Sequence, residues 1–106
     1  MGILVPNVFA DTYIIKISNY AASGGNFEPN VLEILKGDMI KWQNLDQHTV
    51  HTVTSTSGEF DSGELRQSTA SNPCSTCTAI FSHTFEELGT YNYKCKIHGW
   101  MNGVVK

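Results

Sequence analysis

Short runs of alternating apolar and polar residues, each ended by turn residues, recur from residue 12 to the end of this chain. In "TYIIKIS" (12–18), the alternation places Tyr13, Ile15 and Ile17 on one face of a strand. Similar runs include "HTVTS" (51–55), "TAIFSHTFE" (78–86), "LGTYNYKC" (88–95) and the final "GVVK". No segment has a helical period, so the pattern predicts at least six strands in an all-β sandwich or barrel.

Two features of this pattern concern the connections between strands. "VLEILKGDMIKWQN" (31–44) predicts two strands joined at the turn pair Gly37-Asp38. In contrast, "RQSTASNPCSTC" (66–77) is polar, rich in turn residues and long for a connection. Connections of that length are often functional or disordered.

Size and charge narrow the classes of function. The chain has 106 residues, which fits one domain, and its 41% hydrophobic content is that of a globular protein. Its net charge is −3, and its seven Lys and Arg residues form no basic run. Binding of nucleic acid requires clustered cations, so the composition argues against it. No apolar stretch approaches the roughly 20 residues of a membrane-spanning helix.

The first ten residues form a separate unit in this interpretation. "ILVPNVFA" is apolar and stops at Asp11, and Val8 and Ala10 have the spacing of small residues at a signal-peptidase site. Residues 1–10 are therefore either an arm that packs on the domain or the remnant of an export signal. We expect the remnant, and with it an extracytoplasmic protein that is periplasmic, on the cell surface or secreted. Anchoring to a membrane through a segment missing from the N-terminus remains open.

"CKIHGWM" (95–101) carries a thiol, an imidazole and a thioether at equal spacing just before the C-terminus. Cys95 ends a predicted strand, so a loop after it could bend His98 and Met101 towards one cation. "HTVHTVTS" (48–55) supplies a second imidazole. Two imidazoles, a thiolate and a weak thioether select copper in trigonal sites, whereas magnesium and calcium require oxygen ligands.

These motifs resemble the cupredoxins, the small blue-copper proteins that include plastocyanin, pseudoazurin and amicyanin. The matching features run from Phe27 to Lys106: "GDMIKWQNLD" (37–46), "HTVTS", "FDSG" (60–63), "LGTYNYKC" and "CKIHGWMNGVV" (95–105). The short gap between His98 and Met101 resembles the ligand loop of amicyanin. The resemblance implies a Greek-key β-sandwich domain over residues 11–106, with one copper ion that cycles between Cu(II) and Cu(I).

Carried over position by position, the resemblance makes Cys95 the thiolate ligand, His98 the loop imidazole and Met101 the axial thioether. "HTV" occurs twice, so the remaining imidazole is His51 or His48. His51 matches better, because "HTVTS" and then "FDSG" follow it at the family's distance. His48 would be a solvated loop residue or would hang over the site. Met101 would either bind copper or lie in the core, which would leave the axial position long or open.

Several neighbours of the site receive expected roles. Thr52 is a candidate backbone donor to the Cys95 sulfur. Asn44 is expected to tie the His51 loop to the ligand loop, as in relatives. Trp100 would either join a docking face around His98 or fold back over the copper. Trp42 is expected in the core, and His83 on the outer face of its strand with no role.

Cys74 and Cys77 depart from the family pattern, because they lie in an insertion at about residues 66–77. In an exported protein, the simplest interpretation is a disulfide between them. A zinc site made of Cys74, Cys77, Cys95 and His98 also has suitable spacing. That zinc site would leave His51 and Met101 unexplained, so it is the secondary interpretation. A second copper site at Cys74 and Cys77 is a further alternative.

The function expected from the resemblance is transfer of single electrons between redox proteins that dock near His98. The competing class is a copper enzyme with an open coordination position that acts on a small molecule such as a nitrogen oxide. Copper delivery or storage is a third class, against which a single rigid and saturated site argues. Azide or nitrite would change the spectrum of an open site and would leave that of a carrier unchanged. The sequence does not give the oligomeric state.

Overall fold

The structure is a computed structural model in which residues 10–19 and 21–106 are described. Within these residues the chain forms eight strands and one short 3₁₀ turn, η1 (Ala21–Ser23). The strands are β1 (Thr12–Ile17), β2 (Phe27–Glu28), β3 (Val31–Leu32), β4 (Met39–Asn44), β5 (Thr54–Ser55), β6 (Ile80–Thr84), β7 (Tyr91–Lys94) and β8 (Asn102–Val105). No helix in the described part of the chain is long and apolar enough to cross a membrane.

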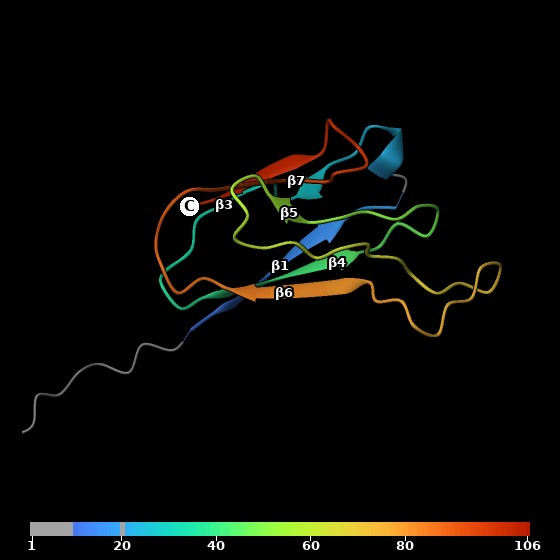
Figure 1. The fold of residues 1–106 in the computed structure, drawn as a ribbon, viewed down its shortest axis with the longest axis horizontal. Coiled ribbons are helices and arrows are strands. Elements are labelled where there is room, and N and C mark those ends of the chain that lie inside the picture. The colour runs from blue at the N-terminus through green and yellow to red at the C-terminus, as the bar shows by residue number, and fades with distance from the viewer. Residues whose placement is uncertain (1–9, 20) are drawn as a thin grey trace, which may run out of the picture.

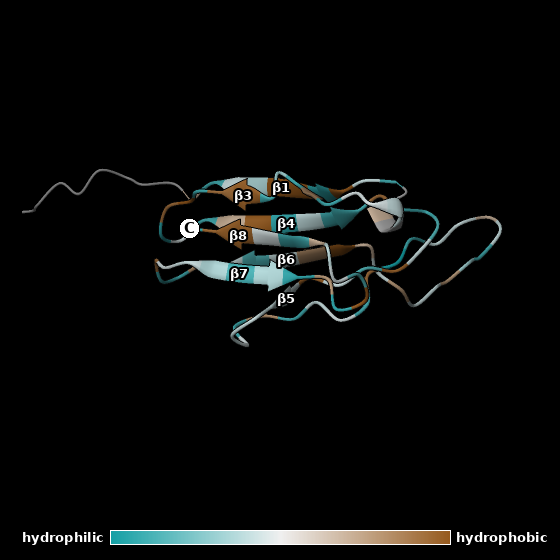
Figure 2. Ribbon diagram, turned by 90° about the horizontal axis from the view of Figure 1, so that it is seen from above, coloured by the Kyte–Doolittle hydropathy of each residue, from teal (hydrophilic) through white to brown (hydrophobic). Residues whose placement is uncertain are grey.

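The strands form two four-stranded sheets, in the orders β2-β1-β4-β6 and β3-β8-β7-β5. The sheets lie face to face, and their strands run in nearly the same direction when seen from above (Figures 1 and 2). This arrangement is an aligned β-sandwich, which confirms the predicted fold class. The predicted arm at residues 1–10 lies, except for Ala10, outside the described residues.

The segment 31–44 connects the two sheets instead of forming a hairpin. β3 pairs with β8 in one sheet, whereas β4 pairs with β1 and β6 in the other. Buried Asp38 organises the crossing, because its carboxylate accepts hydrogen bonds from the backbone N–H groups of Asp11 (2.9 Å) and Leu35 (2.8 Å). The turn residue before it, Gly37, has a φ of 91°, a left-handed conformation that favours glycine.

Aromatic side chains from both sheets fill the space between the layers. Trp42 is fully buried, as predicted, and its ring packs edge-on against the ring of Tyr93 with centroids 5.5 Å apart. Tyr93 lies directly over Gly103 of the neighbouring strand, where a Cβ atom would stand 2.3 Å from the Tyr93 ring. The close packing of β7 on β8 therefore depends on the absence of a side chain at position 103.

His83 corrects one expectation from the sequence. The prediction placed it on the outer face of its strand, but the side chain is half-buried and contacts the rings of Phe60 (4.9 Å) and Phe85 (4.8 Å). Burial lowers the pKa of His83. β6 is the edge strand of its sheet, so this inward position lies at the margin of the core and tolerates a polar ring.

Candidate metal centre

Three side chains that could ligate a metal ion converge at one end of the sandwich. One ligand atom from each of His51, Cys95 and His98 lies within 4.8 Å of the other two, and these residues form the only such group of three or more in the described chain. The Cys95 sulfur is 3.8 Å from Nδ1 of His51 and 3.5 Å from Nδ1 of His98. The structure thus assembles His51, rather than His48, with the two residues of the C-terminal motif.

Each of the three residues has a different support. Cys95 directly follows β7, so the β7–β8 pairing fixes its backbone. The segment after it is closed by two backbone hydrogen bonds, from Cys95 N to Met101 O and from Met101 N to His98 O, both 3.0 Å. These bonds bend the loop and direct His98 back towards Cys95.

His51 lies in a more irregular segment than the sequence predicted. Of the predicted strand 51–55, only Thr54–Ser55 forms β5, while His51 makes an isolated β-bridge with Leu65. Two backbone hydrogen bonds of 3.1 and 2.7 Å hold this bridge. The His51 backbone is therefore held by the segment after "FDSG" and not by a long strand.

Asp46 orients the His51 ring, and the sequence analysis missed this residue. Its Oδ2 lies 2.8 Å from Nε2 of His51, and both side chains are fully buried. A carboxylate only accepts, so Nε2–H donates and Nδ1 is the atom turned to Cys95. Burial by itself lowers the pKa of His51, but the hydrogen bonds with Cys95 and Asp46 raise it overall. A metal ion would therefore displace a proton from Nδ1 while Nε2–H stays on Asp46.

The Cys95 thiol is buried and yet prepared to ionise. Burial raises its pKa, but hydrogen bonds from His51, from the Thr52 backbone N–H and from His98 lower the pKa to about 6. The Thr52 N–H donates to the sulfur over 3.4 Å, the contact for which the sequence made it a candidate. The Thr52 hydroxyl also accepts a hydrogen bond of 2.9 Å from Lys96 N, so the two ligand-bearing segments are joined twice.

Asn44 has a different set of partners from the one expected. Its side-chain N–H donates to Leu65 O (2.7 Å), and its side-chain oxygen accepts from Asp46 N (2.9 Å). Both partners belong to the surroundings of His51. These bonds hold Asn44 to the backbone of Asp46 and Leu65, and its expected link to the 95–101 loop stays a prediction.

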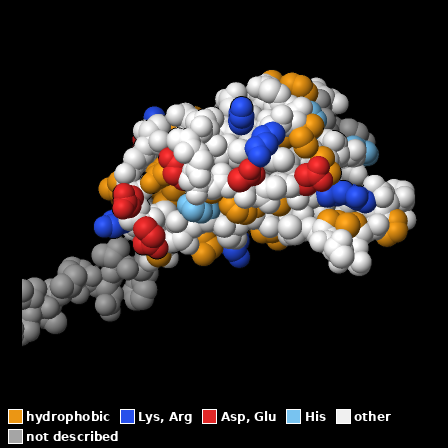
Figure 3. All heavy atoms as spheres, in the orientation of Figure 1, with side chains coloured by type: hydrophobic (Ala, Val, Ile, Leu, Met, Phe, Trp, Pro, Cys, Tyr) orange, Lys and Arg blue, Asp and Glu red, His pale blue; other side chains and the backbone are white. Residues whose placement is uncertain are grey.

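The outer edge of the centre is formed by His98 and Trp100. His98 is half-buried, and its ring lies 5.2 Å from that of Trp100. Trp100 is 48% exposed, and its indole N–H donates to Gly25 O (3.1 Å). Its ring thus leans on His98 and still presents a face to solvent, together with exposed Ile97. Hydrophobic and His side chains come to the surface at this end of the molecule (Figure 3).

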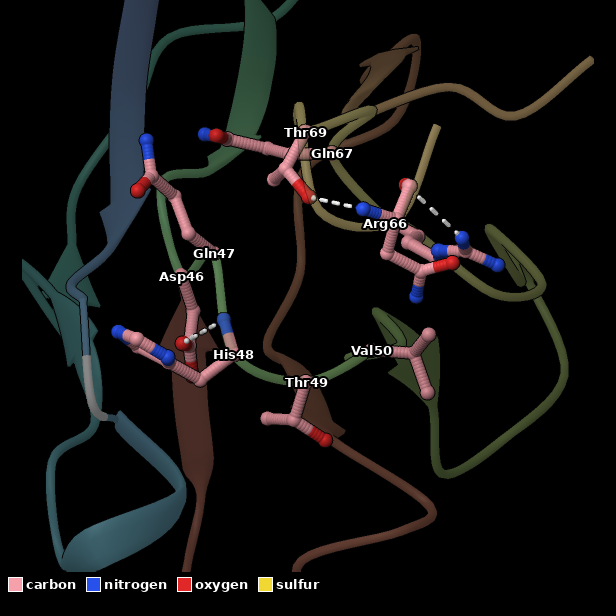
Figure 4. Close-up of a pocket in the computed structure, with 9 residues that line it drawn as sticks. Asp46, Gln47, His48, Thr49, Val50, Arg66, Gln67 and Thr69 are labelled. Carbon is pink, nitrogen blue, oxygen red and sulfur yellow. Dashed lines mark hydrogen bonds between the residues drawn. The ribbon is translucent and has the colours of Figure 1, made fainter. Parts of the chain in front are cut away.

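His48 lies beside the centre rather than in it. Its backbone N–H donates to Oδ1 of Asp46 (2.9 Å), and the residue is exposed. It lines a polar cavity of about 260 Å³ between the 46–50 segment and the start of the 66–77 loop (Figure 4). The walls of this cavity are Asp46, Gln47, His48, Thr49, Val50, Arg66, Gln67, Thr69 and Asn72.

Met101 is fully buried and belongs to the hydrophobic core cluster. Its backbone closes the ligand loop, as described above. A thioether without exposure to water at this position is compatible with either role that the sequence left open, an axial ligand or a core residue.

The structure keeps Cys74 and Cys77 away from the centre. Both are free cysteines in the structure, where the Cys77 thiol donates to Cys74 O over 3.4 Å; the disulfide between them stays a prediction. Neither belongs to the group around Cys95. The alternative zinc site of Cys74, Cys77, Cys95 and His98 is therefore wrong, because the 66–77 loop extends away from the sheets (Figure 1).

The spacing around Cys95 fits a single metal ion. Typical bonds of about 2.0 Å to nitrogen and about 2.3 Å to sulfur reach about 4.3 Å in total. The observed sulfur–nitrogen separations of 3.5 and 3.8 Å are shorter, so each imidazole could share one ion with the thiolate. A soft thiolate combined with two imidazoles is the donor set of trigonal copper sites.

Comparison with known proteins identifies the family. Residues 16–106 match the family described as copper binding proteins, plastocyanin/azurin family. The chain belongs to this family. The match confirms the resemblance to cupredoxins and, together with the His51, Cys95 and His98 group, supports one bound copper ion.

Individual relatives agree with this assignment. Amicyanin from Paracoccus denitrificans is 32% identical over 81 residues, which are 74% of this chain and 56% of that protein, so the chain spans about half the length of this curated relative. The structure of a purple cupredoxin from Nitrosopumilus maritimus is 30% identical, with a TM-score of 0.70 over 89% of this chain and 97% of the other. A copper-containing nitrite reductase from Thermus scotoductus, 20% identical, shares the fold over 99% of this cupredoxin but only 24% of its own chain, with a TM-score of 0.69.

Proposed function

We propose that this cupredoxin carries single electrons between redox proteins through a type 1 copper ion held by His51, Cys95 and His98. The observation that carries the proposal is the convergence of two Nδ1 atoms on a buried sulfur that already favours its thiolate form. Copper bound there supplies a one-electron couple between Cu(II) and Cu(I). The protein's task is then to hold the ligands still, exclude water and leave one edge accessible.

The ligands are held by elements that do not depend on the metal. Asp46 fixes His51, the β7–β8 pairing fixes Cys95, and two backbone bonds fix the loop of His98. Such preorganisation limits rearrangement when the charge of the centre changes, which favours fast electron transfer. His51 and Cys95 have no exposed surface, so among the three clustered ligands only His98 can meet water.

Met101 is proposed as a residue that would add a weak thioether ligand, since it is buried and its backbone is bonded to both Cys95 and His98. The strength of its bond would help to set the potential.

The surface of Ile97, His98 and Trp100 is the proposed docking face. His98 is the only one of the three clustered ligands that is not fully buried, and exposed apolar side chains flank it. A partner that covers this surface would exclude water and approach the copper through one imidazole ring.

The visible spectrum of the copper-loaded protein tests the function. We expect an intense thiolate-to-Cu(II) band that bleaches with ascorbate and does not change when azide or nitrite is added. A band that shifts with either anion would indicate an open coordination position and favour the enzyme class instead. A colourless protein that retains zinc would overturn the copper assignment. The extracytoplasmic location stays a prediction, which fractionation of the source cells would check.

A further inference from the structure

The 66–77 loop is a folded segment that carries its own pair of sulfur atoms. At its base, Arg66 N donates to Thr78 O (2.8 Å). Nearer the cysteines, Cys74 N donates to the hydroxyl oxygen of Ser68 (2.9 Å). The loop is therefore closed on itself, and these bonds fix the backbone that presents the C-x2-C pair.

The two thiols of this pair are neighbours at the surface. Cys74 and Cys77 are both partly exposed, and the Cys77 thiol points to the carbonyl oxygen of Cys74. A hydrogen bond from Cys77 lowers the pKa of Cys74 to about 7, so a large share of this thiol is ionised in neutral solution. One sulfur is thus ready to bind a cation, and the second lies within reach of the same ion.

The surroundings tolerate the negative charge that two thiolates would bring. Residues 66–77 contain one charged residue, Arg66. The hydrogen bond with Cys74 raises the pKa of Cys77, but the positive charge of Arg66 acts in the opposite direction and favours its thiolate.

The number and type of donors restrict the ion. Structural zinc requires four protein ligands, and the described residues bring no third His, Cys, Asp or Glu to this pair. Among the metals that soft thiolates favour, Cu(I) is a monovalent ion that two sulfur ligands satisfy. We propose that Cys74 and Cys77 form a second metal site, which binds one Cu(I) ion between their two sulfur atoms.

This site is independent of the electron-transfer centre and goes beyond the proposed function. Each thiol that ligates releases its proton, and the ion remains Cu(I), so no oxidant or reductant is consumed. An exposed pair can exchange its ion with solvent, whereas the centre at Cys95 is buried. The pair would therefore let the protein take up Cu(I) without disturbing the buried centre.

Titration of the reduced, metal-free protein with Cu(I) under anaerobic conditions tests the site. A coloured Cu(I) chelator reports how many ions each chain retains in competition. We expect two ions for the natural protein and one for Cys74→Ser/Cys77→Ser, whereas Thr76→Ala, which leaves both sulfurs in place, should retain two. Ultraviolet absorption from Cu(I)–thiolate bonds should rise with the second ion only where both cysteines are present.

Two results would overturn the proposal. One is a natural protein that retains no more Cu(I) than the double-serine variant. The other is a Cys74–Cys77 disulfide that survives the reducing conditions, which a thiol count before the titration would show. Far-ultraviolet circular dichroism checks that each variant is folded. Absence of the visible band of the Cys95 centre after reoxidation, in the natural protein and in every variant, would sink the proposed function while leaving the difference in Cu(I) count interpretable.

Discussion

The protein holds the sulfur atoms of its three cysteines in two contrasting ways. Cys95 is fully buried at the end of a strand, and its sulfur is approached by the His98 imidazole of its own loop and, from a distant part of the chain, by the His51 imidazole and the Thr52 backbone N–H. Cys74 and Cys77 are partly exposed on a loop whose supporting hydrogen bonds are local. The first arrangement fixes a geometry, whereas the second leaves sulfur open to exchange and to reagents.

This difference shows that spacing alone does not define the chemistry of a cysteine. C-x2-H and C-x2-C look alike in the sequence, but only the former is joined by a ligand from another segment. His51 reaches Cys95 because Asp46, Asn44 and Leu65 hold its segment in place. The predictions below test this contrast between a buried, cross-braced sulfur and an exposed, locally supported pair.

The largest expected effect is loss of the copper–thiolate chromophore on replacing Cys95. Cys95→Ser should abolish the intense visible band completely, because a hydroxyl does not provide sulfur-to-copper charge transfer. The matched variant Cys74→Ser/Cys77→Ser should keep the band at full intensity. If the double variant lost the colour, the Cys95 centre would depend on Cys74 and Cys77, and the contrast between the two regions would be wrong. Absorption after loading with one equivalent of Cu(II) measures both.

Removing the charge that orients His51 should have the next largest effect. Asp46→Asn replaces an obligate acceptor with a group that can also donate, so Nε2–H is held less firmly. We expect copper affinity to fall by about 10- to 100-fold, the usual range for such partners of metal-bound histidines. Asp61→Asn is the control, since Asp61 is an exposed carboxylate paired with Lys96. Equal affinities for the two variants, measured by chelator competition, would contradict the role of Asp46.

The packing beneath the ligand strand can be tested without metal. Gly103→Ala would place a Cβ atom 2.3 Å from the buried Tyr93 ring, which cannot move without displacing Trp42. We expect a loss of about 1–3 kcal/mol in the free energy of unfolding, the range for overpacked cores. Gly89→Ala, whose nearest new contact is 3.9 Å, should be nearly neutral. Urea unfolding of the metal-free proteins compares them, and similar midpoints would show that Tyr93 has room to shift.

The smallest effect concerns the reactivity of the exposed pair. The thiolate is the nucleophile, so alkylation of Cys74 by iodoacetamide should accelerate as the pH rises through about 7, its lowered pKa. Cys77→Ala removes the hydrogen bond that lowers this pKa. The midpoint should then rise towards the ordinary thiol value of about 8.5, with a rate at neutral pH lower by roughly three- to fourfold. Peptide mass spectrometry follows the rate, and an unchanged midpoint would refute the coupling of the two thiols.

The sequence was most informative where a pattern is local. Alternation correctly assigned the buried face of β1, and the motif order selected His51 over His48. The sequence was misleading where the burial of a residue depends on neighbouring strands. His83 alternates like any strand residue, but the position of β6 at the edge of its sheet decides what its face meets.

Asp46 shows the same limit at the site. In the sequence it is an acidic residue in a polar connection, for which a solvated position is the ordinary expectation. Its burial follows from the 65–67 segment: Leu65 holds Asn44 and His51, and the side chain of Gln67 donates to Asn44 O (2.7 Å). Only the folded arrangement of these segments converts it into the partner of His51.

The strand registers also determine which end of the molecule could be coupled to a linker or an electrode. Tyr91 pairs with Val105 at one end of β7, whereas Cys95 follows the opposite end, and Asp11 accepts a hydrogen bond from Met39 at the start of β4. Asp11 and Lys106 therefore lie far from the loop that carries His98 (Figure 1). A linker or electrode coupled at Lys106 would orient the copper end outwards. The immobilised protein would then present the loop that carries His98 to the solution.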